Sequence, residues 1–155
     1  MTTKKILFAT DFSEGAAVAE AKAVELALAL GAELHLLHSW SIPIVPSGFG
    51  VADVSVDITN AVQNASEELM KRELEKLKAT GLKVQGTVKL AEPWSCIVET
   101  AKAIDASMIV MGTHGRRGLP RVLLGSVAEK VVRTAGCPVL TVSSHDRANA
   151  SVTAA

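Results

Sequence analysis

The chain alternates short apolar runs with longer segments in which apolar residues recur every three or four positions. Residues 4–10, 33–40 and 107–111 are runs of strand length that are dominated by apolar residues. Runs of this kind are typical of strands that are covered on both faces. We therefore predict buried strands in these three places, and we expect the strand at 107–111 to be central in its sheet.

Two further strands are predicted from different patterns. Residues 84–90 alternate Val, Gly, Val and Leu with Gln, Thr and Lys, which is typical of a half-exposed strand at a sheet edge. A short apolar run that starts at Pro138 and ends at Val142 predicts the last strand.

Helical spacing fills the intervals between these strands. The first helix is predicted between Ser13, a good N-cap, and Gly31, a good C-terminal stop. Its periodic apolar residues are Ala17, Ala21, Val24 and Leu28. Further helices are predicted at 58–77, at 93–104 with Pro93 in its first position, and at 126–135. The apolar residues of the second helix are Ile58, Val62, Ala65 and Leu69, continued by Met70, Leu74 and Leu77.

This alternation predicts an α/β fold, a doubly wound five-stranded parallel sheet with helices on both faces. Ligands of such sheets bind beyond the carboxyl ends of the strands, where the strand order reverses. Thr10 and Asp11 follow the first strand, and Met111 and Gly112 end the fourth. If these strands are neighbours, both segments share one crevice.

The length and composition fit one domain, residues 1–143, followed by a flexible tail at 144–155. The segment that starts at Ser41 and ends at Val56 contains two Pro and two Gly and is predicted to be a loop. The formal net charge is zero, which argues against a nucleic-acid-binding or anionic-membrane-binding surface. We expect a cytoplasmic protein without a membrane span or signal peptide, in which Cys96 and Cys137 stay reduced.

The run from Met111 to Lys130 contains the strongest functional pattern. Two residues separate Gly112 from Gly115, and nine separate Gly115 from Gly125, which directly precedes Ser126 and a predicted helix. Glycines let a backbone approach an anion, and the free N–H groups of a helix start bind it. The spacing therefore predicts a phosphate site. The first two glycines can equally form a plain turn, and Ser126 with Glu129 can form a capping box without a ligand.

Other candidate residues also have two interpretations. Asp11 can accept ribose hydroxyls, as acidic residues do in dinucleotide sites, or it can form a local turn bond. Arg116, Arg117 and Arg121 can clamp a triphosphate or remain solvated loop charges. His114 is a loop residue or a contact to the terminal phosphate.

Several chemistries are excluded by the sequence. There is no G-x-x-x-x-G-K-[ST] run and no G-x-G-x-x-G after the first strand, so neither a P-loop enzyme nor a dinucleotide fingerprint is predicted. His35 and His38 lie three apart on a strand and face opposite sides, which makes a poor metal pair. We predict no metal site and no catalytic residue.

Three segments together resemble the universal stress protein family. They are KKILFATDFSE at the start, ELHLLHSW, and MGTHG followed after nine residues by GSVAEKVVRTAGCPVLTV. The resemblance covers roughly residues 4–142, and Ala91 stands where the family usually has Gly. It implies a Rossmann-like sheet of the adenine nucleotide alpha hydrolase kind in the order 3-2-1-4-5, ATP binding, and dimers joined through the last strand. By resemblance, the nucleotide site comprises Ala9, Thr10, Asp11, Ser39, Met111, Gly112, Thr113, His114, Gly115, Arg116, Arg117, Gly125, Ser126 and Val127.

The resulting expectation is an ATP-binding stress-response regulator or nucleotide-dependent switch. ATP, with or without Mg²⁺, is the expected ligand, and a homodimer through the strand from Pro138 to Val142 is the expected assembly. Two alternatives stay open, a slow ATPase and a structural or chaperone-like dimer that binds little nucleotide.

Overall fold

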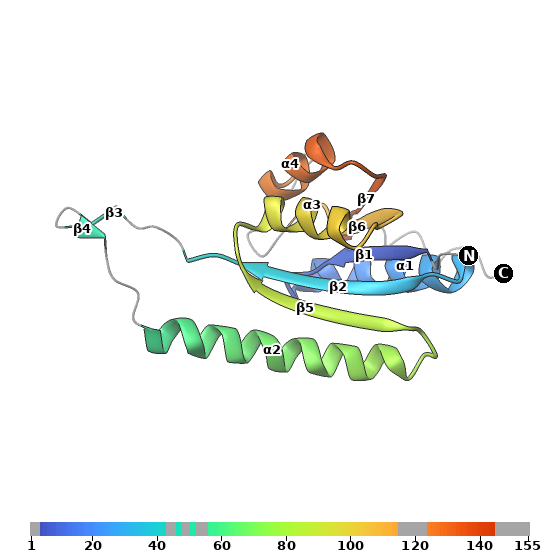
Figure 1. Cartoon of the computed structure of the whole chain (residues 1–155), viewed down its shortest axis with the longest axis horizontal. Helices are drawn as coiled ribbons and strands as arrows, with labels where there is room; N and C mark the ends of the chain where they lie inside the picture. Colours follow the sequence, from blue (N-terminus) through green and yellow to red (C-terminus); the bar gives the residue numbers. More distant parts are fainter. Residues whose placement is uncertain (1–3, 43–45, 48–49, 52–55, 115–123, 145–155) are drawn as a thin grey trace.

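A parallel sheet of five strands lies between two layers of helices (Figure 1). The computed structural model describes residues 4–42, 46–47, 50–51, 56–114 and 124–144. The strands of this sheet are β1 (Lys5–Ala9), β2 (Glu33–Trp40), β5 (Val84–Leu90), β6 (Met108–Gly112) and β7 (Val139–Val142). The helices are α1 (Glu14–Leu30), α2 (Val56–Lys78), α3 (Pro93–Ala103) and α4 (Ser126–Thr134).

The strand order confirms the predicted topology. The sheet runs β5-β2-β1-β6-β7, which is the order 3-2-1-4-5 when its five strands are counted along the chain. Every neighbouring pair is parallel. β5 and β7 are the outer strands, as predicted for the alternating segment and for the last strand.

Each face of the sheet has its own hydrophobic core. Ile6 and Phe8 of β1 point to the face covered by α1 and α2, whereas Leu7 points to the face covered by α3 and α4. All three side chains are fully buried, because β1 lies in the middle of the sheet. The buried run at 4–10 is therefore explained by burial on both faces.

The ends of α1 are as predicted, but its inner face is not. Ser13 Oγ accepts a hydrogen bond from Ala16 N–H at 3.2 Å, and Gly31 ends the helix with φ 59°. The residues packed on the sheet are Ala16, Ala19, Ala23 and Ala27. Ala17, Ala21 and Leu28, which had the predicted spacing, are exposed. An Ala-rich helix shows several apolar stripes, and the small residues at 16, 19, 23 and 27 allow the closest approach to the strands.

The predicted loop between Ser41 and Val56 contains more structure than expected. It includes a two-stranded antiparallel ladder, β3 (Pro46–Ser47) with β4 (Gly50–Val51), and its last residue already begins α2. On α2 itself the inner face is formed by Ser66, Met70 and Leu77.

Four of the apolar residues whose spacing predicted this helix lie on its outer face, namely Ile58, Val62, Ala65 and Leu69. Ile58 is 57% exposed and Leu69 is 40% exposed. Met70 and Leu77, which continue the predicted spacing, lie on the inner face instead.

Cys96 and Cys137 are both free in the structure. Cys96 is buried in α3, and Cys137 is half-buried before β7. Burial raises the pKa of the Cys137 thiol, which reduces its thiolate content and its reactivity. No helix in the described part of the chain is long and apolar enough to cross a membrane.

Candidate functional site

The carboxyl ends of β1 and β6 lie side by side at one end of the sheet. Ala9 is in register with Met111, so the predicted adjacency of the first and fourth strands is confirmed. Thr10 and Asp11 therefore leave β1 next to the point where Gly112 ends β6. Here the chain order reverses, because β1 continues to β2 on one side of the sheet and β6 to β7 on the other.

The turn after β1 is held by its own side chains and by β2. Phe12 N–H donates to Thr10 Oγ1 at 3.0 Å, and Ser13 N–H donates to Asp11 Oδ1 at 2.9 Å. The second bond is the local turn bond that the sequence allows at Asp11. His38 Nδ1–H donates to Thr10 O at 2.9 Å, which fixes the turn against β2.

Phe12 adopts a left-handed backbone conformation, with φ 60°. Residues other than glycine rarely do so, and such conformations gather at functional sites. The Phe12 ring lies 4.7 Å from the ring of His38, centroid to centroid. His38 is only 5% exposed. Both residues shape the site, but the sequence did not predict their role, since nothing in T-D-F-S indicates a positive φ at Phe.

A pair of backbone hydrogen bonds joins the glycine motif to the sheet and to α4. Thr113 N–H donates to Val142 O at 3.0 Å, and Gly125 N–H donates to Thr113 O at 2.8 Å. The second bond brings together the two ends of the motif across the intervening residues. The start of α4 therefore lies directly beside the end of β6.

Gly125 is required by a close backbone contact. A Cβ atom at this position would lie 2.9 Å from Thr113 O. Its φ of −60° is ordinary, so the requirement is space and not conformational freedom. Gly112 is less crowded, because a Cβ atom there would lie 3.5 Å from His114 O.

The helix α4 begins without a side-chain cap. Gly125 is the N-cap residue and Ser126 is the first helical residue, so the predicted capping box is wrong. Ser126 lies one position beyond the N-cap, so its side chain does not cap α4. The Glu129 carboxylate forms an ion pair with Arg133 instead. The first N–H groups of a helix have no partner within it, and the N-cap residue of α4, Gly125, has no side chain that could satisfy them.

One polar atom of the site is buried without a partner. His114 Nδ1 hydrogen-bonds with Thr113 Oγ1 at 2.9 Å. Its other nitrogen, Nε2, is buried and has no hydrogen-bond partner among the described residues. A buried polar atom of this kind is costly unless something outside the described chain satisfies it.

The other predicted site residues are distributed as follows. Ser39 lies two positions beyond Leu37, the register partner of Ala9, and so runs alongside the turn at Asp11. The side chains of Met111 and Val127 belong to the core under α3 and α4, so only their backbones can face a ligand. Gly115, Arg116, Arg117 and Arg121 lie outside the described residues.

The two histidines of β2 occupy separate environments. His35 Nε2 hydrogen-bonds with Thr87 Oγ1 at 3.0 Å, whereas His38 bonds Thr10 at the end of the sheet. They lie on opposite faces, as strand alternation predicts. Burial, and next the charges of Lys89 and Lys5, lower the pKa of His35. Over the described ranges, no three His, Cys, Asp or Glu residues lie close enough to hold a metal ion.

Comparison with known proteins gives a consistent result. Residues 2–143 match the model of the universal stress protein family. The universal stress protein MJ0577 of Methanocaldococcus jannaschii is 35% identical, over 90% of this chain and 94% of its own. A second protein of that organism, universal stress protein MJ0531, is 34% identical, over 90% of this chain and 81% of its own.

Solved structures also match over nearly the whole chain. The structure of MJ0577 has a TM-score of 0.72 at 31% identity and covers 92% of this chain and 97% of that one. A universal stress protein from Archaeoglobus fulgidus in complex with dAMP has a TM-score of 0.62 at 27% identity. The match covers 91% of this chain and 98% of that one.

Proposed function

The chain belongs to the universal stress protein family, and we propose that it is an ATP-binding regulator whose nucleotide lies at the junction of β1, β6 and α4. ATP binding in such a protein acts as a switch if the nucleotide binds one conformation better than another. The proposed setting is the cytoplasm.

One observation carries this proposal: an uncapped helix N-terminus is fastened to the end of a central strand. The Gly125–Thr113 hydrogen bond of 2.8 Å holds α4 beside β6, and among the described residues α4 has no side-chain cap, because its N-cap residue is Gly125. The N–H groups of its first turn are therefore available to an anion, and the helix dipole favours negative charge there. A phosphate chain is the ligand that this arrangement suits.

The described residues fit a nucleotide in two further respects. His114 Nε2 is buried beside the proposed phosphates and lacks a partner in the described chain, and a phosphate oxygen would satisfy it. The absence of a side chain at Gly125 lets the start of α4 approach the backbone of Thr113, so that the strand end and the helix start meet at the proposed phosphate position.

We assign different residues to the phosphates, the ribose and the adenine of the nucleotide. Ser126 and the backbones of Thr113 and Val127 would hold phosphate, with Gly115, Arg116 and Arg117 from the adjoining segment. Asp11 would accept the ribose hydroxyls, and the Ser39 backbone would meet the adenine edge. Ala9, Thr10 and Met111 would form the floor. A bound Mg²⁺ would neutralise part of the triphosphate charge.

The comparison with the Archaeoglobus protein supports the adenine nucleotide class. That protein is 27% identical and its structure contains dAMP. We propose ATP in preference to a monophosphate because Arg116, Arg117 and Arg121 supply charge for several phosphate groups.

We do not propose that the protein hydrolyses ATP efficiently. The turn at Asp11 holds its carboxylate beside Ser13, on the proposed ribose side, so it is not aimed at the terminal phosphate. We propose that ATP is held and hydrolysed slowly, if at all.

Isothermal titration with ATP tests the proposal directly. We expect the native protein to bind ATP and Ser126→Ala to bind about 3-fold to 30-fold more weakly, as for the loss of one phosphate hydrogen bond. Ser107→Ala is the matched control, because its hydroxyl donates to Lys5 O where β1 begins, at the other end of that strand from the site. Absence of binding by the native protein would refute the proposal and favour the structural dimer.

A further inference from the structure

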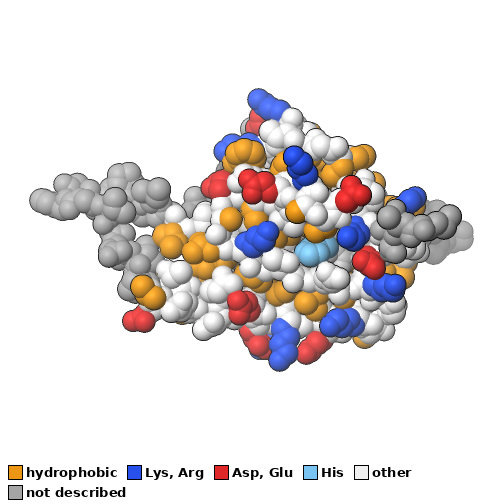
Figure 2. All heavy atoms as spheres, in the orientation of Figure 1, with side chains coloured by type: hydrophobic (Ala, Val, Ile, Leu, Met, Phe, Trp, Pro, Cys, Tyr) orange, Lys and Arg blue, Asp and Glu red, His pale blue; other side chains and the backbone are white. Residues whose placement is uncertain are grey.

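A groove lies between the outer strand β5 and the helix α2. It measures about 570 Å³, and its hydrophobic lining comes from Met70, Leu74 and Val88, with Gly86 between them. Charged residues of both signs from α2 form its rim, namely Glu67, Lys71, Glu75 and Lys78. Figure 2 shows charged side chains of both signs on this side of the molecule, with hydrophobic side chains between them.

The groove borders an open sheet edge. Within the described ranges β5 pairs with β2 alone. Leu34 N–H donates to Lys83 O at 2.9 Å, and Ala91 N–H donates to Trp40 O at 2.8 Å. Odd-numbered residues of β5 therefore direct their backbone groups toward β2. Because this direction alternates along a strand, the N–H and C=O groups of Val84, Gly86 and Val88 point outward, beside the groove.

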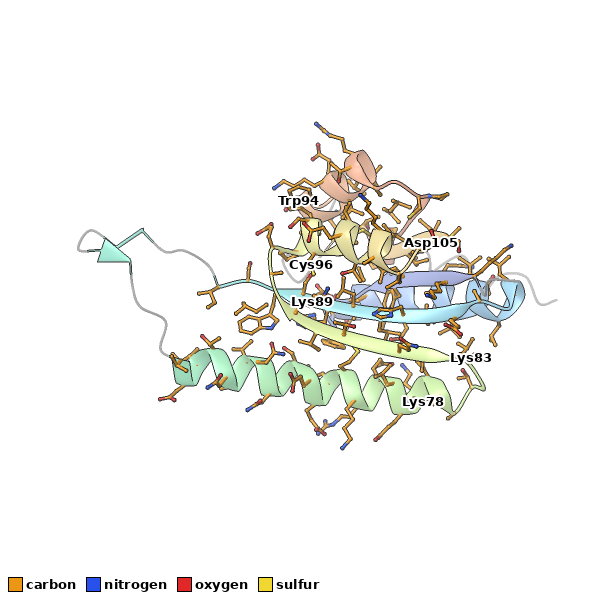
Figure 3. The ribbon with its side chains drawn as sticks, in the orientation of Figure 1. Lys78, Lys83, Lys89, Trp94, Cys96 and Asp105 are labelled. Carbon is orange, nitrogen blue, oxygen red and sulfur yellow. The ribbon has the colours of Figure 1, made fainter. Side chains whose placement is uncertain are left out.

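The two faces of this edge favour different types of side chain in an added strand. On the α2 face, Gly86 has no side chain, and the ends of Met70 and Leu74 reach over it, so the floor of the groove is apolar between its charged rims. On the opposite face, Lys83 and Lys89 lie near the two ends of β5 (Figure 3). An added strand would therefore present hydrophobic and acidic residues in alternation.

Among the described residues, no carboxylate lies closer than 4.0 Å to either lysine. The Lys83 side chain is 79% exposed, and its one ion pair within the described chain is with Glu33 at 4.0 Å. Lys89 donates to the neutral Thr100 Oγ1 at 3.3 Å. Both ammonium groups can therefore attract an acidic partner.

The same lysines argue against a second copy of this edge as the occupant. Antiparallel self-pairing about Gly86 would set Lys83 directly opposite Lys89 in both halves of the pair. Like charges in opposite positions destabilise a strand pair. Charge complementarity therefore selects an acidic strand and not another β5.

We propose that the β5 edge and the α2 groove bind an extended protein segment in which hydrophobic and acidic residues alternate. The segment joins the sheet as a sixth strand, held by backbone hydrogen bonds to Val84, Gly86 and Val88. This proposal does not depend on the nucleotide site.

The test uses labelled peptides and fluorescence anisotropy, without nucleotide. The probe is Glu-Val-Thr-Leu-Thr-Val-Glu, which reads the same in both directions and so serves either strand orientation. Its control carries Lys in place of both Glu residues. We expect the acidic peptide to bind roughly ten-fold more tightly at low salt, with the preference shrinking as salt rises. The double variant Lys83→Glu with Lys89→Glu should reverse the preference.

A second pair of variants tests the backbone. Val88→Pro removes an outward N–H and leaves the ladder to β2 intact, since edge strands tolerate proline. We expect it to abolish binding, whereas Val88→Ala keeps the N–H and should keep binding. Circular dichroism and urea midpoints verify that each variant is folded.

Three results would overturn the proposal. One is that the acidic and basic peptides bind equally well, or that neither peptide binds. Another is unchanged binding by a folded Val88→Pro. The last is a native dimer in sedimentation that Val88→Pro dissociates, which would assign this edge to a second copy.

Discussion

At the scale of single residues, Gly125 shows how one missing side chain sets the position of a helix. A Cβ atom there would lie 2.9 Å from Thr113 O, a backbone atom that has no side-chain rotation to relieve the contact. We expect Gly125→Ala to lower the free energy of unfolding by about 1–3 kcal/mol, the usual cost of overpacking. Gly136→Ala is the control, because its Cβ would meet nothing within 4 Å. Urea denaturation measures both, and equal stability of the two variants would contradict the expectation.

His35 gives a residue-scale prediction about pH. Burial first, and then Lys89 and Lys5, lower its pKa from the ordinary value of 6.5. The folded state thus disfavours the protonated imidazole, and the unfolded state binds that proton more tightly. The contribution of His35 to stability is therefore greatest above pH 6.5 and is lost as pH falls from there toward its lower folded pKa.

His35→Gln isolates this effect, because glutamine can still hydrogen-bond with Thr87. Between about pH 7.5 and about pH 5.5, we expect the variant to lose less stability than the native protein. Urea midpoints at the two pH values measure the difference, since every other titrating group is shared. An equal loss in both proteins would show that His35 contributes nothing in this range.

At the scale of elements, the sequence predicts the sheet better than the helix faces. The order of strands and the ends of α1 follow from apolar runs, Ser13 and Gly31, which are local signals. The inner face of α1 does not follow, because alanines surround the helix and only packing selects Ala16 over Ala17. The glycine motif marks the candidate site in the sequence, but the Gly125 close contact, the lack of a side-chain cap on α4 and the positive φ of Phe12 arise from tertiary structure.

The contact between α2 and β5 is testable as a coupled pair of positions. A Cβ atom at Gly86 would lie 2.5 Å from Met70 Sδ. The same Cβ atom would lie 2.9 Å from Leu74 Cδ1, so in Gly86→Ala both side chains must move. Met70→Ala would remove the shortest of these contacts and give Leu74 space to shift. We expect the double variant to be more stable than the sum of the single losses predicts, by roughly 0.5–3 kcal/mol. Strict additivity in urea unfolding would mean that the two positions do not share this space.

At the scale of the whole molecule, the outer strand β7 is the proposed dimer contact. Ile109 N–H donates to Pro138 O and Thr113 N–H to Val142 O, so Val139 and Thr141 direct their backbone groups outward. We expect Thr141→Pro to convert a dimer to a monomer in sedimentation, since it removes an outward N–H and no ladder bond. Thr141→Val keeps the N–H and should stay dimeric. A native monomer at micromolar concentration would contradict the proposed assembly.

The hydrogen bond from Gly125 to Thr113 determines which sequence changes the glycine segment can accept. It joins the two ends of the glycine segment through backbone atoms alone, so the junction does not depend on which side chains lie between them. Loop closure becomes only slightly harder as a loop grows, by about 0.6 kcal/mol for each doubling of its length. Residues between the two anchors can therefore be replaced, lengthened or shortened while the strand and helix stay in place. Selection or design can alter ligand preference there with little risk to the fold.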